Sequence, residues 1–281
     1  MGGCILYEKA RGVIMAPEVM GLVGGPFQHA YTSTLWKKSA HIQWDFQAKC
    51  HPRTFYVDRQ IIDGTRETSS GDKYGWLLES RLVIAGLVEW VIDNLEAVLQ
   101  TYEAIFTHDQ RLLQLHEKFK WTPAYGLYID KPQLHEKTKL LSMITSNKTM
   151  TKNHLLRNHL AMRWKNHLDL YGRGYHEIEK KEEGLCEYMF SVAIENDCYE
   201  TYFTEKILDC FAVGTIPVYL GAPDIGKHFN ENGIIVLSPQ TALKDLTSDL
   251  YYEKIEAVRD NFERVLRYNV LEDWIYETYF R

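Results

Sequence analysis

The clearest pattern of apolar and polar positions in this chain lies between residues 188 and 224. Met189–Ile194 is an apolar run with one serine, which is typical of a buried parallel strand, and residues 195–202 after it are mostly polar. Apolar residues then recur at helical spacing, at Ile207, Leu208, Phe211 and Ala212. Because a second apolar run, Thr215–Leu220, follows directly, the pattern predicts a strand, a loop, a helix and a second parallel strand.

The polar residues of this unit gather where such a fold presents a ligand site. Thr204 is placed to cap the helix, and Gly214 stands where it would end. In units of this kind ligands lie beyond the carboxyl ends of the strands, and the free N–H groups that open the helix favour a phosphate. Lys206 adds a positive charge there, and Glu205 can accept hydrogen bonds from sugar hydroxyls. An ordinary capped helix with a solvated Glu-Lys pair fits these few residues equally well.

The rest of the second half continues the alternation of strands and helices. The predicted elements are a strand at 139–145, a helix at about 151–163, a strand at Leu168–Tyr171, a turn at Gly172–Gly174 and a strand at Gly233–Leu237. From Leu250 to Arg281 the pattern is mostly helical.

The first half has a weaker pattern. Thr54–Ile62 and Ala104–Thr107 are predicted strands, and Leu82–Tyr102 is predicted to be one long helix. Before Thr54 we assign no element, and the glycines of Val19–Pro26 fit either a loop over a ligand or a structural turn. The whole pattern predicts an α/β protein of two Rossmann-like domains, with a boundary near residue 136.

Composition narrows the class of protein. With 25% charged and 45% apolar residues, the chain of 281 residues is predicted to be globular and soluble, and large enough for two cores. A net charge of −6 argues against a nucleic-acid partner. The five cysteines (Cys4, Cys50, Cys186, Cys198 and Cys210) form no Cys-x-x-Cys pair, so neither a disulfide framework nor a zinc site is predicted. We also find no signal peptide and no apolar run of transmembrane length.

Residues 188–237 resemble the nucleotide-sugar signature of the α1,3-fucosyltransferase family. The matching residues are Glu195-Asn196, Tyr202-Phe203-Thr204-Glu205-Lys206, Gly214-Thr215-Ile216-Pro217-Val218 and Gly221-Ala222-Pro223. Further upstream, Ser142–Asn147 with Arg157, and Leu170–Gly174, are similar to the start of the family's donor domain. Trp76–Ser80, Ala104–Asp109 and Tyr125-Gly126 are similar to landmarks of its acceptor domain. The resemblance is good over about 137–240, moderate over about 70–136 and absent from the first 50 residues.

The resemblance implies a fold and an activity. Members are inverting enzymes with a GT-B fold that use GDP-β-L-fucose as donor and fucosylate a glycan, here through an α1,3 or α1,4 link. It implies an acceptor domain at 1–136, a donor domain at 137–262 and a last helix, 263–281, that crosses back to the first domain. Trp274, Ile275, Tyr279 and Phe280 offer an apolar face for that crossing. Since the chain lacks the membrane helix of eukaryotic members, we expect a cytoplasmic bacterial or viral type or a catalytic domain without its anchor, with peripheral membrane attachment left open.

The leaving diphosphate needs positive charge. Arg157 can make a two-pronged contact with phosphate oxygens, and Lys206 acts as a point charge at the start of the helix. The chain contains no Asp-x-Asp pair, so we expect no obligatory metal, although Mn²⁺ or Mg²⁺ can stimulate the activity. Glu195-Asn196-Asp197 is the nearest substitute for a metal site.

The other candidate residues are assigned mainly by resemblance. Tyr202 and Glu205 are expected to hold guanine and ribose, and Asn196 to hold a sugar hydroxyl or to cap its own turn. Thr204, Ser146 and Arg173 complete the donor-binding set, although Arg173 fits a solvated position in a glycine turn equally well. Glu79, at the end of an apolar stretch, is the candidate general base, with an exposed helix position as the alternative.

Two other functions remain open from the sequence. The same fold can use another nucleotide sugar, because Arg157 and Lys206 recognise any diphosphate. A catalytically silent binding protein is a second alternative, since the first domain matches the family poorly.

Overall fold

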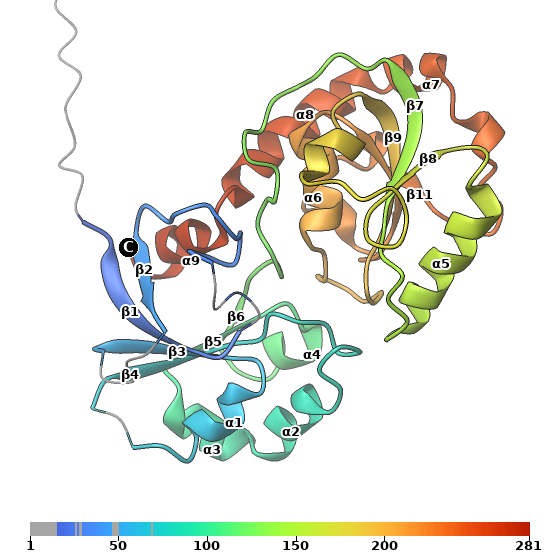
Figure 1. Ribbon diagram of the computed structural model, residues 1–281. Helices are drawn as coiled ribbons and strands as arrows, with labels where there is room; N and C mark the ends of the chain where they lie inside the picture. The colour runs from blue at the N-terminus through green and yellow to red at the C-terminus, as the bar shows by residue number, and fades with distance from the viewer. Residues whose placement is uncertain (1–15, 26, 28–29, 47–50, 69) are drawn as a thin grey trace, which may run out of the picture.

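Two parallel β-sheets form the framework of the molecule (Figure 1). The computed structural model describes residues 16–25, 27, 30–46, 51–68 and 70–281. The first sheet uses strands from residues 18–121 and the second uses strands from residues 139–236. The two sheets carry their helices separately, and the chain passes from one to the other between Trp121 and Lys139. This arrangement agrees with a division near residue 136, which stays a prediction.

The first sheet has the strand order β2-β1-β3-β4-β5-β6, and every pairing in it is parallel. Its strands are β1 (Glu18–Val23), β2 (Ile42–Asp45), β3 (Arg53–Val57), β4 (Asp72–Trp76), β5 (Ala104–Thr107) and β6 (Phe119–Trp121). Helices α1 (Gln60–Gly64), α2 (Leu87–Asp93), α3 (Leu95–Thr101) and α4 (Gln110–Leu113) connect them.

Successive residues of these strands point to opposite faces of the sheet and so build two cores. Tyr56 and Ile105 pack against α1, α2 and α3 on one face, whereas Phe55 and Phe106 pack on the other face against residues from the end of the chain. One face is therefore left for the C-terminal helix to cover.

Several predictions for the first half were wrong in extent. The predicted strand Thr54–Ile62 ends at Val57, because the backbone turns at Asp58, whose φ is +51°. The predicted helix Leu82–Tyr102 begins only at Leu87, after Gly86 with a φ of +81°, and breaks at Asn94 into α2 and α3.

The segment Val19–Pro26 was also misjudged. Residues up to Val23 form β1, an inner strand, and only Gly24 and Gly25 turn, with φ values of +83° and +91°. Pro26 lies outside the described residues, as do Cys4 and Cys50. Cys186, Cys198 and Cys210 are free thiols.

The second sheet has the order β11-β10-β9-β7-β8, again with parallel pairings. Its strands are β7 (Lys139–Ile144), β8 (Asp169–Tyr171), β9 (Tyr188–Ile194), β10 (Ile216–Leu220) and β11 (Ile235–Val236). The predicted elements are confirmed here with small shifts, except that the strand predicted at Gly233–Leu237 is only two residues long.

Helices cover both faces of this second sheet. Helices α5 (Lys152–Trp164), α7 (Ser248–Glu253) and α8 (Ile255–Val265) share a core with Phe190 and Val192. Helix α6 (Glu205–Ala212) packs on the other face, beside Ala193 and Tyr219. Because β9 is the middle strand, its carboxyl end lies between α5 and α6, where the loop of residues 195–202 begins.

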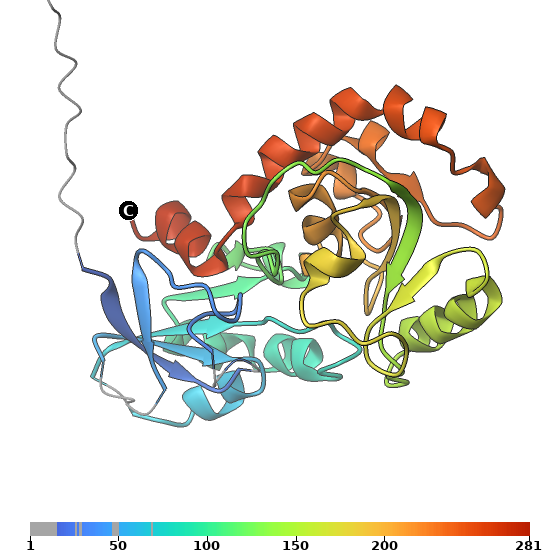
Figure 2. The ribbon, with the colours of Figure 1, turned by 45° about the horizontal axis from the view of Figure 1, so that its top comes forward.

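The C-terminal helix α9 (Leu271–Tyr279) returns to the first sheet, as predicted (Figure 2). Leu271 and Ile275 are buried in the core with Phe55 and Trp76. The buried carboxylate of Glu272 accepts hydrogen bonds from the backbone N–H of Ser33 at 2.6 Å and from the indole of Trp44 at 3.2 Å. The helix therefore closes the face that α1–α4 leave open. Among the described helices, none is long and apolar enough to cross a membrane.

Candidate active site

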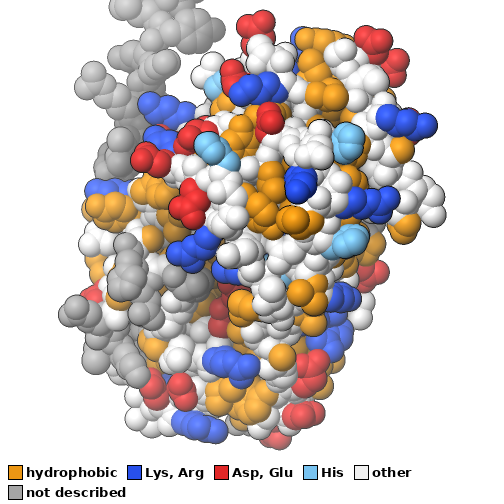
Figure 3. All heavy atoms as spheres, turned by 45° about the vertical axis from the view of Figure 1, so that its right-hand side comes forward, with side chains coloured by type: hydrophobic (Ala, Val, Ile, Leu, Met, Phe, Trp, Pro, Cys, Tyr) orange, Lys and Arg blue, Asp and Glu red, His pale blue; other side chains and the backbone are white. Residues whose placement is uncertain are grey.

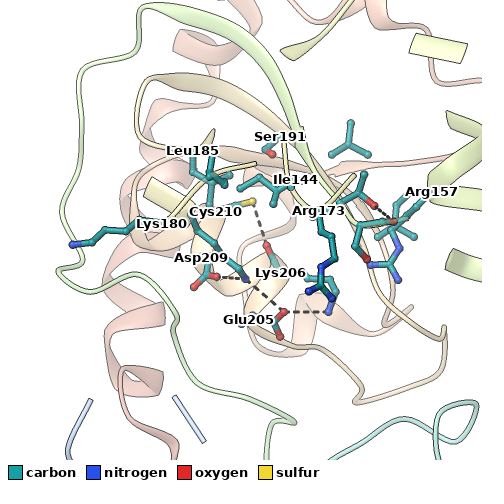
Figure 4. A pocket seen from close by; sticks show the side chains of 18 of the residues that line it. Ile144, Arg157, Arg173, Lys180, Leu185, Ser191, Glu205, Lys206, Asp209 and Cys210 are labelled. Carbon is teal, nitrogen blue, oxygen red and sulfur yellow. Dashed lines mark hydrogen bonds and ion pairs between the residues drawn. The ribbon is translucent and has the colours of Figure 1, made fainter. Parts of the chain in front are cut away.

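A pocket of about 330 Å³ opens at the carboxyl ends of β7 and β9 (Figure 4). Its walls come from the ends of β7 and β9, from the glycine turn after β8, from residues 178–185 and from the first turns of α6. Its charged lining residues are mostly basic: Arg157, Arg173, Lys180, Lys181 and Lys206 against Glu179, Glu205 and Asp209. A pocket of this kind fits an anionic ligand with polar groups.

Arg157 is the most constrained cation of this pocket. It lies on the inner face of α5, is only 6% exposed, and donates a hydrogen bond from Nη2 to the side-chain oxygen of Asn196 at 2.7 Å. Its Nε is buried and has no hydrogen-bond partner. Burial lowers the pKa of this guanidinium. A buried donor without a partner is costly, so this Nε is an exception among the buried polar groups of the fold.

A buried carboxylate fixes the start of α6. Glu195, at the end of β9, is fully buried and accepts hydrogen bonds from the backbone N–H of Thr204 at 2.9 Å and from its hydroxyl at 2.7 Å. The Thr204 hydroxyl in turn caps the helix by accepting from the N–H of Lys206. Glu195 therefore ties the strand to the N-cap of the helix, nine residues later.

Lys206 and Glu205 form a cluster of charges in the first turn of this helix. The ammonium of Lys206 lies 3.5 Å from Glu195 and 3.3 Å from Glu205, and Lys181 lies 3.5 Å from Glu205. Burial alone would raise the pKa of Glu205, but the cations Lys206 and Lys181 outweigh it and hold this pKa at about 2. Burial raises the pKa of Glu195, and the nearby Lys206 and the hydrogen bonds from Thr204 offset this rise only in part. Glu205 is therefore an anion that can accept hydrogen bonds from ligand hydroxyls at any moderate pH.

The loop after β7 and the glycine turn after β8 each bring one further predicted residue to the pocket. Ser146 and Arg173 both line it, and Lys180, also in its wall, extends away from it in Figure 4. Gly172, with a φ of +108°, lies so close to the carbonyl oxygen of Thr145 that a side chain would collide with it. This turn thus needs glycine, which explains the Gly-x-Gly spacing in the sequence.

Three predicted donor-binding residues, Asn196, Tyr202 and Thr204, are not among the residues that line this pocket. Asn196 instead accepts a hydrogen bond from Arg157, which does line it. Tyr202 is 1% exposed and stacks on Tyr199, with ring centroids 4.8 Å apart, beside His108. Thr204 is buried, and its hydroxyl is engaged with Glu195 and the helix start. The structure places both beneath the site, where they hold the loop and helix that form it.

Glu79 lies in the first domain, three residues after the end of β4 rather than on the strand itself. It is half-buried, and its Oε1 accepts a hydrogen bond from the hydroxyl of Tyr125 at 2.9 Å. Its backbone N–H donates to Asp58 at 3.2 Å, and burial, with Glu79 adding to it, raises the pKa of Asp58 to about 7. An exposed position on a helix, the alternative for Glu79, is wrong.

The Tyr125 hydroxyl, which donates to Glu79, responds to carboxylates of both halves of the chain. Burial raises the pKa of the Tyr125 hydroxyl well above its usual value, and both Glu79 and Glu205 contribute to the rise. Both carboxylates are therefore within electrostatic range of one hydroxyl.

Sequence reasoning missed Lys181 and Asp209. Asp209 of α6 is 1% exposed, pairs with Lys181 at 2.7 Å, and accepts backbone hydrogen bonds from Tyr128 and Ile129 in the segment between the two sheets. Burial raises the pKa of Asp209, whereas the two carboxylates around Lys181 raise its pKa against the effect of burial. The sequence offered one signal, an Asp within the predicted helix that packs on the sheet. A buried Asp requires a partner, but the sequence does not show which residue provides it.

The described residues contain no group of three or more His, Cys, Asp or Glu side chains placed to hold a metal ion. Glu195 is occupied by Thr204 and Lys206, and Asn196 by Arg157. The Glu195-Asn196-Asp197 segment is thus engaged with protein groups.

Comparison with known proteins finds a family that is similar to most of the second half of the chain. Residues 134–268 match the C-terminal domain of glycosyltransferase family 10, the fucosyltransferases. The α-(1,3)-fucosyltransferase of Helicobacter pylori is 39% identical over 62 residues, which are 22% of this chain and 13% of that enzyme. GDP-fucose protein O-fucosyltransferase 3 of Danio rerio is 37% identical over 67 residues, 24% of this chain and 15% of that protein. The chain thus spans less than a sixth of the length of these curated relatives.

Solved structures extend the likeness to the whole fold. A crystal structure of an α1,3-fucosyltransferase superposes with a TM-score of 0.52 at 15% identity, covering 92% of this chain and 84% of that one. A second, of an α1,3-fucosyltransferase with GDP, has a TM-score of 0.52 at 13% identity over 98% of this chain and 91% of that one. The predicted GT-B fold is confirmed, and over residues 134–268 the chain is similar to the C-terminal domain of glycosyltransferase family 10, the fucosyltransferase family that its motifs resemble.

Proposed function

We propose that this protein transfers L-fucose from GDP-β-L-fucose to a hydroxyl of a glycan, with inversion at the sugar carbon and an α1,3 or α1,4 link in the product. The observation that carries the proposal is Arg157: a buried guanidinium with an unpartnered Nε, lining a basic pocket in a domain of glycosyltransferase family 10. The curated relative from Danio rerio is named for GDP-fucose, and one solved neighbour was crystallised with GDP.

In this mechanism the diphosphate occupies the mouth of the pocket. Arg157 donates to its oxygens, Lys206 supplies a second charge, and the N–H groups that open α6 add the positive end of the helix dipole. Glu205, Ser146, Arg173 and Asn196 bind hydroxyls and position the nucleotide sugar. As the bond from the sugar to the diphosphate breaks, these charges stabilise the negative charge on the departing GDP.

Glu79 completes the reaction from the other domain. Its carboxylate takes the proton of the acceptor hydroxyl while that oxygen attacks the sugar carbon from the side opposite the leaving GDP. The Tyr125 hydroxyl, 2.9 Å away, positions the carboxylate. The direction of attack gives inversion.

We further propose that no metal ion is obligatory, because Arg157 and Lys206 already face the place of the diphosphate. Activity measured in excess EDTA is expected to stay within about twofold of the untreated value. Complete loss in EDTA with recovery on adding Mn²⁺ would show that a metal carries the charge instead.

Two measurements test the donor and the reaction. Thermal shifts with GDP, UDP, GDP-fucose and GDP-mannose should be largest for the guanine nucleotides, and GDP release from GDP-fucose should depend on a glycan acceptor. Arg157→Lys keeps the charge but loses the fork of donors, so it should weaken GDP binding by about tenfold or more, whereas Arg259→Lys on the exposed face of α8 should not. Equal stabilisation by UDP would indicate another nucleotide sugar, and release of no GDP with any acceptor would indicate a silent binding protein.

A further inference from the structure

A stretch of the second domain has an unusual charge for this chain. Residues 137–168 contain seven Lys or Arg and no Asp or Glu, although the whole protein has a net charge of −6. Arg157 belongs to the pocket, and Lys137 is buried, where it donates to backbone carbonyls. Of the others, Lys148, Lys152, Arg163 and Lys165 are exposed around helix α5. Across the part of the chain that the structure describes, none of these four forms an ion pair.

Large apolar side chains protrude from the same helix. Leu155 is 56% exposed and Met162 is 59% exposed, and Met150, just before the helix, is 66% exposed. Leu155 and Met162 are seven residues apart and so lie on one side of α5, next to the row formed by Lys152 and Arg163. We call these residues, Lys148, Met150, Lys152, Leu155, Met162, Arg163 and Lys165, the α5 outer face.

The fold does not use this outer face. The inner face of α5 carries Asn153, Arg157, Leu160 and Ala161, which are buried against the sheet or line the pocket. The α5 side of the molecule turns toward the viewer in Figure 3, where hydrophobic side chains lie beside those of Lys, Arg and His. A helix that is apolar on both its inner and outer sides has more apolar surface than its own domain can bury.

We propose that the α5 outer face binds a membrane surface that contains anionic lipids. The face is convex, so its apolar side chains are placed to enter a soft layer rather than to fill a pocket. Unpaired cations beside them match the negative charge of lipid headgroups, and basic residues flanking exposed Leu and Met are typical of helices that lie in the plane of a bilayer. An acidic protein surface would pair with these cations, but it would also need cavities shaped to receive Met150, Leu155 and Met162.

This orientation has a consequence for the pocket. Arg157 projects from the opposite side of the same helix, so docking would hold the pocket about one helix diameter, roughly 10 Å, from the headgroups. The inference concerns attachment only and does not depend on which nucleotide sugar the pocket binds.

Sedimentation of the full chain with lipid vesicles tests the proposal. Vesicles of phosphatidylcholine and phosphatidylglycerol in equal parts should bind the protein, and vesicles of phosphatidylcholine alone should not. The double substitution Lys152→Glu with Arg163→Glu should weaken binding by about tenfold or more, and so should high salt. Leu155→Ser with Met162→Ser should also weaken it, which separates insertion from simple charge attraction.

A matched pair on another surface provides the control. Val236 is 72% exposed and Lys244 is exposed, so Val236→Ser with Lys244→Glu removes the same kinds of group far from α5 in the sequence. This control variant should bind vesicles as the original protein does, and all variants should keep its melting temperature, because every changed residue is exposed. The proposal is overturned if anionic vesicles do not bind the protein, if both α5 variants bind as the control does, or if soluble polyglutamate is bound and vesicles are not.

Discussion

At the scale of single residues, the site depends on polar groups that are buried but not fully partnered. Arg157 is the main example, because its Nη2 is held by Asn196 while its Nε has no acceptor. Asn196 thereby orients the guanidinium instead of capping a turn. A phosphate oxygen that accepted a hydrogen bond from Nε would interact with a charged donor whose side chain is already ordered, so binding would not carry the cost of ordering it.

Glu79 provides the sharpest test at this scale. Glu79→Gln keeps the size of the side chain and can still interact with Tyr125, but it cannot take a proton. We expect turnover to fall by ~100-fold or more, with GDP affinity unchanged, as measured by GDP release and by titration with GDP. Glu96→Gln, an exposed position on α3, is the control and should keep full turnover. Unchanged turnover in Glu79→Gln would mean that another group is the base.

The residues that could be predicted are those whose role is local in sequence. Thr204 caps the helix, and Gly172 and Gly214 have positive φ, because caps and tight turns depend on a few neighbouring residues. The packing of Tyr202 could not be predicted, because the motif shows that a Tyr precedes the helix but not that its ring turns inward to Tyr199. Lys181 was missed because its partner Asp209 is 28 residues away and only the fold brings them together.

At the scale of elements, contacts between α6 and the segments packed against it fix the walls of the pocket. Residues 181–184 form a short 3₁₀ helix that carries Lys181 to Asp209 and Glu205, and Asp209 also holds the segment between the sheets through Tyr128. The ring of Tyr128 completes this cluster, with the ammonium of Lys181 4.7 Å from its centroid. Three chain segments therefore meet at one buried ion pair.

Removing Lys181 should loosen this junction. Lys181→Met preserves the length of the side chain but leaves the carboxylate of Asp209, which is 1% exposed, without its cation. The free energy of unfolding should fall by about 3 kcal/mol, because an uncompensated buried charge is costly. Chemical denaturation measures the change. In the double variant Lys181→Met with Asp209→Asn the loss should be smaller, and an equal or larger loss would contradict the idea that the stranded charge is its cause.

The strands and helices themselves were predicted better in the second half than in the first. In β9 every residue from Tyr188 to Ile194 is buried, so the sequence shows a nearly continuous apolar run with Ser191 as its one small polar residue. The edge strand β2 has only four residues with alternating burial, and in β1 the buried residues are few, so neither gives a strong pattern. The break at Asn94 was invisible because apolar residues of α2 and α3 continue at helical spacing on both sides of it.

At the scale of the whole molecule, helix α9 and the loop after β9 provide two of the contacts that join the domains. Helix α9 buries Leu271 and Ile275 in the first domain, and the loop after β9 places Tyr199 and Thr201 against His108. His108 follows β5 of the first domain and is 2% exposed. The strength of these contacts limits how far the two domains can separate.

The contact at His108 fits the neutral imidazole. Its Nε2 lies 3.2 Å from the carbonyl oxygen of Leu78, which can only accept, and its Nδ1 lies 3.0 Å from the Tyr199 hydroxyl, which can donate. Burial lowers the pKa of His108 to about 4, and Arg81 lowers it further while the Leu78 hydrogen bond and Asp109 oppose this. A second proton on the ring would leave the Tyr199 hydroxyl without its acceptor and place a charge beside Arg81.

Domain attachment should therefore weaken in acid. Because the folded-state pKa of His108 lies below that of an unfolded histidine, about 6.5, the unfolded chain binds a proton first, and stability is lost as pH falls from about 6.5 to about 4. The contribution of His108 to this loss is at most about 3 kcal/mol.

The variant His108→Asn removes this titration. Its free energy of unfolding, although lower at neutral pH, should therefore depend less on pH across this range. Part of the slope should remain in that variant, because burial also lowers the pKa of His154 to about 4. His167→Gln controls for the loss of a histidine at an exposed position. Identical slopes for the original protein and His108→Asn, measured by denaturation at several pH values, would show that this interdomain histidine does not set the acid sensitivity of the fold.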